Sequence, residues 1–348
     1  MIFLRHHKGG GMEPVRLRRK MFFLGLITLI HSQSIALNLT FFALSDTHYG
    51  NDAGDREANR AALIETLNAL PGRDYPLSSG GGTVSEPRGI LLPGDVTENP
   101  DSNLWNRYAE NFGVEGEGKI RYPVYDGLGN HDEPGISQGI LPRFIQRNAL
   151  RREKIALDST GYHYSWDWDG VHFINLNLYS GTVQGTGIGN PLGAVDFLKQ
   201  DLQTQVGNSG RPVFVMQHYP FDAPGFWWQE TEKQATISIL SNYNVIGLLN
   251  GHSHIQRFYS WNGLNAFDDG TAMSGEALVF HITEGRILAV NLIQGEWGNL
   301  LLDKNISMGN MAGLRPQRRN SVQTGSRRTE WRDLNGRKRK IIFRTTLP

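Results

Sequence analysis

The stretch Leu39-Thr40-Phe41-Phe42-Ala43-Leu44-Ser45-Asp46-Thr47-His48 leads from an apolar run into a polar pair. Its first six residues are rich in Phe and Leu, which predicts a short buried strand. Polar groups at the carboxyl end of a strand in an open α/β sheet commonly form a ligand site. Asp46 and His48 are therefore candidate functional residues.

The same order of apolar run and polar residues recurs four more times along the chain. The runs at 89–92, 122–125, 212–216 and 245–249 lead, in turn, to Gly94-Asp95, Gly129-Asn130-His131-Asp132, Gln217-His218 and Gly251-His252-Ser253-His254. Imidazole and carboxylate groups are ligands for divalent metal ions such as manganese, zinc, iron or nickel. One metal site shared by five strand ends is the economical explanation.

The remaining patterns predict a layered α/β fold. Residues 55–70 have helical periodicity, whereas the Gly- and Ser-rich residues 78–82 predict a loop. Two further segments, 164–178 with Asp169-Gly170 and 278–292 with Glu284-Gly285, predict β-hairpins. We expect two mixed β-sheets packed face to face as a sandwich, with helices outside and the metal site at the carboxyl ends of strands.

The composition is that of an ordinary globular protein, with 348 residues of which 39% are hydrophobic and 20% charged. The sequence has no Cys, which excludes disulfides, thiolate metal sites and a cysteine nucleophile. The net charge of +1 is unevenly distributed, because residues from 315 onward carry +9 and residues before 37 carry +5. The body between them therefore carries −13, a charge poorly suited to tracking a nucleic-acid backbone.

The N-terminal residues have the order of a secretory signal. Basic residues at 16–20 precede an apolar run at 21–30 and the small-residue segment Ser34-Ile35-Ala36. This apolar run is too short for a stable bilayer-spanning helix, which needs about 20 residues. We predict cleavage after Ala36 and an exported, periplasmic or secreted protein. An ordinary secretory signal is favoured over the twin-arginine type that Arg18-Arg19 partly resembles.

The chain therefore divides into the signal peptide and upstream residues at 1–36, one catalytic domain at 37–312 and a basic tail at 313–348. The tail is polar and lacks apolar periodicity, which predicts a solvated, disordered segment. Its alternative role is attachment to an anionic surface such as lipid, polyphosphate or nucleic acid.

The five motifs, in this order, resemble the calcineurin-like metallophosphoesterase family over residues 39–293. The resemblance implies a hydrolase that cleaves a small phosphorylated substrate, either a monoester or a diester, with two divalent metal ions. The implied ligands are Asp46, His48 and His254 for one ion, Asn130, His218 and His252 for the other, and Asp95 for both.

The resemblance also implies a division of chemical roles. Two cations about 3.5–4 Å apart can clamp phosphoryl oxygens and lower the pKa of a shared water, so attack by a metal-bridging hydroxide is implied. His131 would face the substrate and stabilise or protonate the leaving alkoxide, and Asp132 would orient His131.

One position separates this chain from the purple acid phosphatases. In those enzymes the aspartate motif continues to a metal-binding tyrosine three residues on, whereas this chain has Glu98. No tyrosinate site is expected. The intact Asp46-x-His48 pair instead resembles the branch that includes cyclic-nucleotide phosphodiesterases, protein phosphatases and nucleases.

Beyond the ligands, the candidates for a substrate pocket are Glu98, Asn99, Tyr219, Trp227 and Trp228. The segment 221–228 after His218 would form an aromatic wall beside the site or would cover the core, because Trp is highly buried on average. His163, His172 and His281 lie in strand patterns and are given no role.

Two other functions stay open at this point. A nuclease or cyclic-nucleotide phosphodiesterase would use the same metals, and the basic tail favours it whereas the acidic body does not. A non-catalytic metal-binding protein would keep the fold, but the complete ligand set argues against it.

Overall fold

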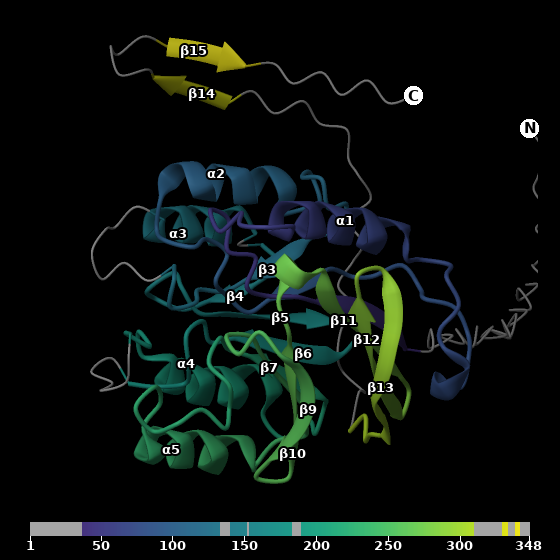
Figure 1. The fold of residues 1–348 in the computed structure, drawn as a ribbon. Coiled ribbons are helices and arrows are strands. Elements are labelled where there is room, and N and C mark those ends of the chain that lie inside the picture. Colours follow the sequence, from purple (N-terminus) through teal and green to yellow (C-terminus); the bar gives the residue numbers. More distant parts are fainter. Residues whose placement is uncertain are drawn as a thin grey trace, which may run out of the picture. The chain divides into compact units, whose positions relative to one another are not determined.

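The computed structural model describes residues 37–132, 140–151, 153–182 and 189–309, and the backbone of 329–332 and 338–341. The predicted signal segment and most of the predicted tail lie outside the described residues. Every described helix is too short or too polar to cross a lipid bilayer. Figure 1 shows the arrangement of the elements.

One sheet has six strands and contains the strand predicted at 39–44. Its strands, in spatial order, are β13 (Glu296–Asn305), β12 (Arg286–Ile293), β11 (Glu276–Thr283), β1 (Asn38–Ala43), β2 (Ile90–Leu92) and β3 (Val124–Asp126). The strands β1, β2 and β3 run parallel, and β11 pairs antiparallel with β1. The first three motifs therefore follow the same ends of three neighbouring parallel strands.

The other sheet has seven strands. In spatial order they are β4 (Ala156–Leu157), β5 (Tyr164–Trp168), β6 (Val171–Asn175), β7 (Val213–Met216), β8 (Val245–Asn250), β10 (Leu264–Asp269) and β9 (Gln256–Trp261). The strands β6, β7, β8 and β10 are parallel, and both sheets are therefore mixed. The last two motifs follow the ends of β7 and β8.

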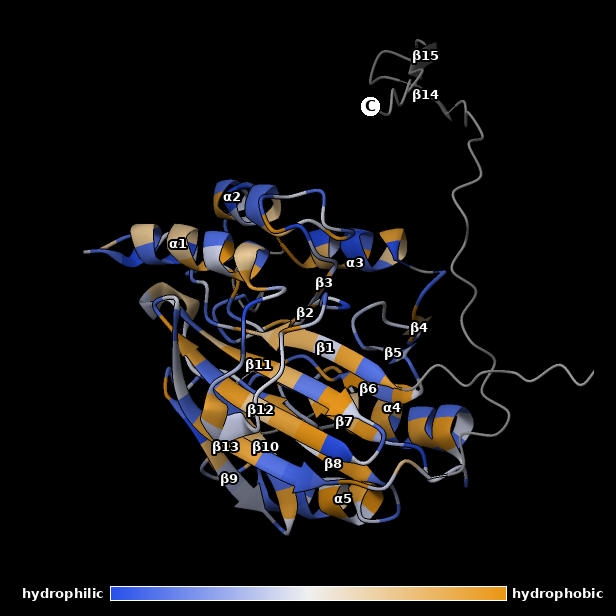
Figure 2. Cartoon of the chain, turned by 90° about the vertical axis from the view of Figure 1, so that its right-hand side faces the viewer, coloured by the Kyte–Doolittle hydropathy of each residue, from blue (hydrophilic) through white to orange (hydrophobic). Residues whose placement is uncertain are grey.

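The two sheets pack face to face around an aromatic core. Successive residues of a strand point to opposite faces, so Phe41 of β1 points into this core while Phe42 points outward. The ring of Phe41 stacks on Phe280 at 4.8 Å and meets Phe173 and Phe214 edge-on, both at 5.3 Å between centroids. Figure 2 shows the hydrophobic residues along these strands. The burial of these four rings, which come from both sheets, stabilises the packing of one sheet on the other.

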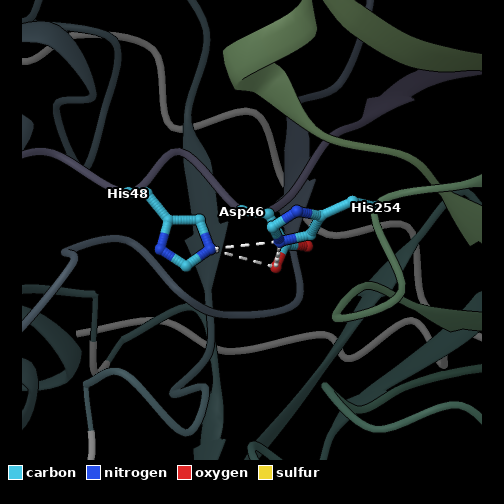
Figure 3. A group of neighbouring side chains, drawn as sticks. All are labelled: Asp46, His48 and His254. Atoms are coloured by element: carbon cyan, nitrogen blue, oxygen red, sulfur yellow. Dashed lines mark hydrogen bonds and ion pairs between the residues drawn. The ribbon is translucent and has the colours of Figure 1, made fainter. Parts of the chain in front are cut away.

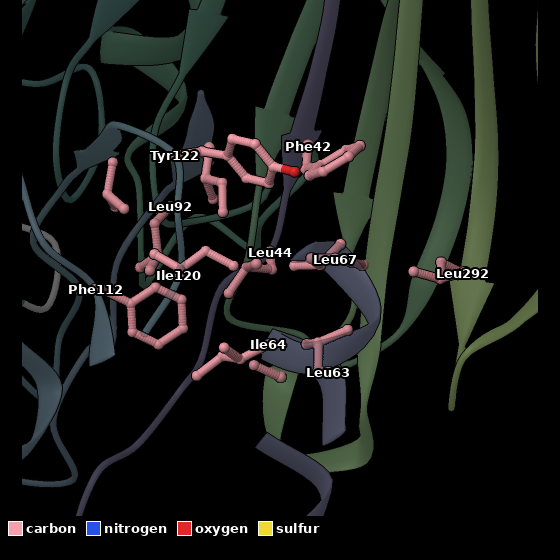
Figure 4. Close-up of a cluster of buried hydrophobic side chains, with 14 of the residues drawn as sticks. Phe42, Leu44, Leu63, Ile64, Leu67, Leu92, Phe112, Ile120, Tyr122 and Leu292 are labelled. Atoms are coloured by element: carbon pink, nitrogen blue, oxygen red, sulfur yellow. The ribbon is translucent and has the colours of Figure 1, made fainter. Parts of the chain in front are cut away.

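Three helices cover the outer face of the six-stranded sheet, and they are α1 (Arg56–Ala69), α2 (Ser102–Asn111) and α3 (Leu141–Leu150). Leu63 and Leu67 of α1 pack on Phe42 and Leu292, as Figure 4 shows. The helix α2 begins at Asp101, whose side chain accepts hydrogen bonds from two backbone N–H groups of the first turn.

Two helices, α4 (Ala194–Asp201) and α5 (Glu230–Leu240), cover the outer face of the seven-stranded sheet. Their cluster includes Leu198, Leu240 and the outward residues Val213 and Val215 of β7. The α4 helix continues into a π-helical turn at Leu202–Val206. The described residues 37–309 thus form four layers, with helices outside both sheets.

The structure confirms the predicted fold class, the helix near 55–70 and both hairpins, whose strands are β5 with β6 and β11 with β12. One difference falls in the basic tail. The short strands β14 (Thr329–Arg332) and β15 (Lys338–Ile341) pair antiparallel inside the segment for which composition predicts disorder. Composition is a property of the whole segment and does not detect a local pairing of four residues.

Candidate metal centre

The loops that carry the first two motifs are joined by backbone hydrogen bonds. The N–H of Asp46 donates to the carbonyl of Gly94 at 3.1 Å, and the N–H of His48 donates to that of Asp95 at 3.0 Å. The parallel pairing of β1 and β2 thus continues beyond the strand ends. Likewise the N–H of Gly251 donates to the carbonyl of His218 at 3.1 Å, which joins the last two motifs.

Several predicted ligands have a backbone that L-amino acids rarely adopt. Positive φ angles occur at Asp46 (53°), His48 (40°), Asp95 (51°), His252 (70°) and His254 (56°). Such a conformation costs of order 1–3 kcal/mol for a residue other than Gly and persists where the surroundings impose it, often at functional sites. The turns after these strands therefore aim the side chains at one place.

The first group of ligands is formed by Asp46, His48 and His254, which Figure 3 shows pointing toward one another. The Nε2 atoms of the two imidazoles lie 3.2 Å apart. The Oδ1 of Asp46 lies 3.1 Å from the Nε2 of His254 and 3.5 Å from that of His48. Asp46 is fully buried, whereas the side chain of His254 is 39% exposed, so the group opens to solvent on one side.

The second group is formed by Asp95, His218 and His252, whose ligand atoms lie within 4.8 Å of one another. The Nε2 of His218 lies 3.2 Å from the Oδ2 of Asp95 and 3.0 Å from the Oδ1 of Asn130. The same Oδ2 lies 3.6 Å from the Nε2 of His48. Asp95 therefore stands between the two groups.

The donor set fits divalent metal ions. Imidazole nitrogens and carboxylate oxygens converge in both groups, and convergent ligands of these two kinds suit zinc, manganese, iron or nickel. The backbone packs closely against one of these side chains, because a Cβ on Gly94 would come within 2.8 Å of the Nδ1 of His218. The structure brings all seven predicted ligands together at the carboxyl edges of the two sheets.

Charge in this centre is shared between carboxylates and imidazoles. Burial raises the pKa of Asp46, but hydrogen bonds from His254 and His48 outweigh it and hold this pKa well below its usual range. Burial lowers the pKa of His218, but Asp95 outweighs this effect and raises it to about 9. Burial and the charge of His218 lower the pKa of His252 to about 4. The buried carboxylates thus require compensating positive charge, which metal cations would supply.

His131 lies beside the ligands, with its ring centroid 4.6 Å from that of His48. Its Nδ1 lies 2.7 Å from the backbone carbonyl oxygen of Glu98. A carbonyl only accepts, so Nδ1 carries the proton and donates. The backbone N–H of His131 also donates to the Oδ1 of Asp95 at 2.8 Å. Both contacts orient the imidazole.

The contacts of Asp132 differ from the role that the resemblance implies, which is to orient the imidazole of His131. Its two carboxylate oxygens accept hydrogen bonds from the backbone of Val96, Thr97 and Gly129 and from the hydroxyl of Thr97, at 2.9–3.0 Å. The carboxylate therefore ties the loop of His131 to the loop of Asp95, while the carbonyl of Glu98 orients the ring. Burial and the charge of Asp95 raise the pKa of Asp132 to about 6 despite these bonds.

Sequence reasoning missed the polar support beneath Asp46. The hydroxyl of Ser45 contacts the carboxylates of both Asp46 and Asp269. The hydroxyl of Thr271 donates to the carbonyl of Asp46 at 3.0 Å. Asp268 and Asp269 are the last two residues of the strand β10 and follow the apolar pair Ala266-Phe267. This order of apolar residues and carboxylates at a strand end resembles the five motifs, and it could have indicated the two aspartates.

The predicted pocket residues fall into four environments. Glu98 is in ion-pair contact with His48 at 2.9 Å, and Asn99 is exposed. Tyr219 and Trp227 both contact the ring of His252, at centroid distances of 4.8 and 4.3 Å. Trp228 is fully buried, and its indole N–H donates to the carbonyl of Ser180, so the structure places it in the core rather than beside the ligands.

Comparisons with known proteins give a family match by sequence and a likeness of fold. The model of the calcineurin-like phosphoesterase family matches residues 39–256. A search of curated proteins gives no match. Among solved structures, GAP50, the anchor in the inner membrane complex of Plasmodium, is 13% identical with a TM-score of 0.51, covering 78% of this chain and 89% of that chain.

Two further solved structures are similar at lower TM-scores. The calcineurin-like phosphoesterase YfkN from Bacillus subtilis is 15% identical with a TM-score of 0.40, covering 80% of this chain and 92% of that chain. A putative 5′-nucleotidase from Staphylococcus aureus is 14% identical with a TM-score of 0.42, covering 81% and 56%. The likeness to GAP50 supports the fold alone, and the family rests on the sequence model. That model spans more than half of the chain and includes all five motifs, so the chain belongs to the calcineurin-like phosphoesterases, a family of metal-dependent hydrolases of phosphoester bonds.

Proposed function

We propose that this chain hydrolyses a phosphoric mono- or diester with two divalent metal ions. Asp46, His48 and His254 would hold one ion, and Asn130, His218 and His252 would hold the other. The observation that carries the proposal is the place of Asp95, whose Oδ2 lies 3.6 Å from the Nε2 of His48 and 3.2 Å from that of His218. A single carboxylate in contact with both ligand groups is what a bridged pair of ions needs.

When bound, two such ions neutralise phosphoryl oxygens and lower the pKa of a water that serves as nucleophile. The chain's own residues position the groups that take part in the reaction. The backbone ties between the motif loops hold the carboxylates in place, so that little reorganisation is needed during the reaction.

The imidazole of His131 would assist the leaving group. Because Nδ1 donates to the carbonyl of Glu98, Nε2 is the ring nitrogen left for the substrate. In its protonated form Nε2 can donate to an alkoxide as the ester bond breaks, which is general acid catalysis and contributes typically about 10²–10⁴-fold to the rate.

The test is hydrolysis of paired nitrophenyl mono- and diesters after chelation, with manganese, zinc, iron or nickel added back singly. Metal-restored activity is expected, and it would reveal the ester preference. Protein that binds two ions per chain and hydrolyses neither ester with any metal would contradict the proposal and favour a binding role.

The role of His131 has its own variant. His131→Ala is expected to keep both ions and to lose about 10²–10⁴-fold in kcat. His281→Ala is the matched control, since His281 lies on β11 and bonds to Asn38. Full turnover in His131→Ala would refute the role of His131.

We also propose that the protein is exported, which the order of basic, apolar and small residues at 16–36 supports. N-terminal sequencing of secreted protein should begin after Ala36. Retention of Met21 in the mature protein would contradict export by this signal.

A further inference from the structure

The segment that follows the ligand His218 is unusually aromatic. We call residues 219–228 the aromatic loop, and its rings are Tyr219, Phe221, Phe226, Trp227 and Trp228. Two of them anchor the loop in the core, because Phe221 and Trp228 are fully buried and both contact the ring of Trp261. Covering the core is therefore accomplished by these two side chains.

Two other rings, those of Tyr219 and Trp227, contact the candidate metal ligand His252. Trp227 meets His252 edge-on, with centroids 4.3 Å apart and planes at 89°, and it stacks with Tyr219 at 5.7 Å. Trp227 is half-buried, and Phe226, which contacts it edge-on at 5.3 Å, is 64% exposed. An accessible aromatic surface thus begins at a metal ligand and continues outward.

The aromatic loop is held in this position from outside. Asp222 accepts two hydrogen bonds from the guanidinium of Arg257, at 2.9 and 2.7 Å. The N–H of Phe221 donates to the hydroxyl of Tyr259 at 2.9 Å, and this hydroxyl donates to the Oδ1 of Asn250 at 2.7 Å. Asn250 directly precedes the Gly251-His252 motif, so one chain of bonds fixes both the loop and the ligand. A surface ordered in advance binds a ligand at a lower entropic cost.

Three described arginines near the motif loops are paired with carboxylates of the protein, whereas Arg56 bonds to the side-chain oxygen of Asn51. Arg257 bonds to Asp222 and Asp268, and Arg60 and Arg107 both bond to Asp52. These arginines are therefore engaged with the protein's own carboxylates and are poorly placed to bind a second anionic group. The complement to the surface of Trp227 and Phe226 is an uncharged, flat group.

We propose that the organic part of the substrate carries an uncharged flat ring, which packs against Trp227 and Phe226 while its phosphoryl group faces the metal ligands. This inference rests on the proposed function for the phosphoryl end and adds the class of the other end. Aromatic rings prefer offset-stacked or edge-to-face contacts, and the half-buried Trp227 with its exposed neighbour Phe226 offers both kinds of surface.

The test is the affinity of three non-hydrolysable probes for the manganese-loaded protein, measured by isothermal titration. Benzylphosphonate is expected to bind about tenfold more tightly than methylphosphonate. This is the gain in affinity that stacking of one flat ring on an aromatic side chain gives. Cyclohexylmethylphosphonate, which is apolar but not flat, should bind more weakly than benzylphosphonate. Equal affinities for benzyl- and methylphosphonate, or for benzyl- and cyclohexylmethylphosphonate, would overturn the proposal.

Variants assign the effect to the loop. Trp227→Ala should reduce the ratio of benzyl- to methylphosphonate affinity to near one, and Phe226→Ala should reduce it partly, without loss of a buried side chain. Trp297→Ala is the matched control, because Trp297 is also partly buried but lies on β13 against Tyr75. An unchanged ratio in both loop variants would overturn the proposal.

The outcomes separate this inference from the proposed function, because probe binding needs no turnover. Protein that hydrolyses no ester but keeps the affinity ratio would contradict the function and support the ring site. Two sources of the ring are distinguished by kcat/KM for adenosine 5′-phosphate against ribose 5-phosphate. A preference for the nucleotide identifies a nucleobase, whereas equal values identify an aryl group nearer the phosphate.

Discussion

The carboxylate of Glu98 lies 2.9 Å from the Nδ1 of His48, on the opposite side of the imidazole from the other predicted metal ligands. The contact is an electrostatic one, and its geometry is not that of a linear hydrogen bond. The Nδ2 of Asn51 donates to the same carboxylate at 3.1 Å and so holds it beside the ring. A metal-binding histidine whose second nitrogen meets a carboxylate is a more basic and better oriented ligand.

Glu98→Ala should therefore weaken metal binding by about 10–100-fold, the usual cost of losing such a partner. Glu98→Gln, which removes the charge but keeps the shape, should fall between Glu98→Ala and the wild type. Metal titration of the chelated protein measures both, with Glu65→Ala on the exposed side of α1 as the control. Equal affinities in all four proteins would show that Glu98 does not support His48.

Much of the metal centre was predictable because each motif is local. An apolar run that ends in Asp46-x-His48 needs no distant information, and the parallel pairing of neighbouring strands then brings such ends together. The contacts that were missed join residues far apart in sequence, such as Ser45 with Asp269, 224 positions away. Nothing local to either residue specifies that pair.

The aromatic loop shows a second limit. Trp227 and Trp228 are adjacent and chemically identical, yet one contacts His252 and the other lies in the core. Which ring turns which way depends on how the loop is anchored by Asp222 and Phe221 to the strand β9. Periodicity gives no answer in a loop, because neither the helix nor the strand repeat applies there.

A buried ion cluster below the third motif should be essential for stability. Asp126, at the end of β3, is fully buried against Arg147 and Arg151 and accepts a hydrogen bond from the hydroxyl of Tyr108 at 2.7 Å. Removing one partner of a buried pair leaves uncompensated charge and costs about 3–5 kcal/mol. Asp126→Ala should lower the free energy of unfolding by that amount in urea titrations.

The control for this prediction is a surface pair of the same chemistry. Asp303 pairs with Arg286 where both side chains are exposed by more than a third, and exposed pairs contribute about 0–1 kcal/mol. Asp303→Ala should therefore change the free energy of unfolding little. Equal losses in Asp126→Ala and Asp303→Ala would refute the distinction.

The stability of the fold should depend on the protonation of His172. Its Nδ1 and Nε2 each lie 2.7 Å from a carboxylate oxygen, of Asp167 and Asp201 respectively, and the guanidinium of Arg211 lies 3.2 Å from Nδ1. Burial lowers the pKa of His172, but the hydrogen bonds to Asp167 and Asp201 outweigh it and raise this pKa above its ordinary value of 6.5.

The folded protein therefore keeps a proton on His172 that the unfolded chain releases above about pH 6.5. This contribution to stability is fully present below that pH and is lost as the pH rises through the folded pKa. The free energy of unfolding of the wild type, relative to His172→Gln, should fall between about pH 6.5 and the folded pKa. A difference that stays constant across this range would contradict the prediction.

Gly251 should be required for full metal affinity because its neighbours leave no space for a side chain. A Cβ at this position would collide with the Oγ of Ser45 and the Oδ2 of Asp46. The backbone cannot move aside easily, since the N–H of Gly251 donates to the carbonyl of His218. Gly251→Ala must therefore displace Asp46, and we expect at least about a tenfold loss of metal affinity.

Gly225→Ala is the matched control for Gly251→Ala, because a Cβ on Gly225 meets nothing within 4 Å. Both variants should be titrated with manganese and melted without metal, so that lost affinity is separated from lost folding. Since the clash is with a ligand carboxylate, Gly251→Ala should lose affinity even where the metal-free protein remains folded. If the two variants bind manganese equally well, Asp46 is not held in place by the close approach of Gly251.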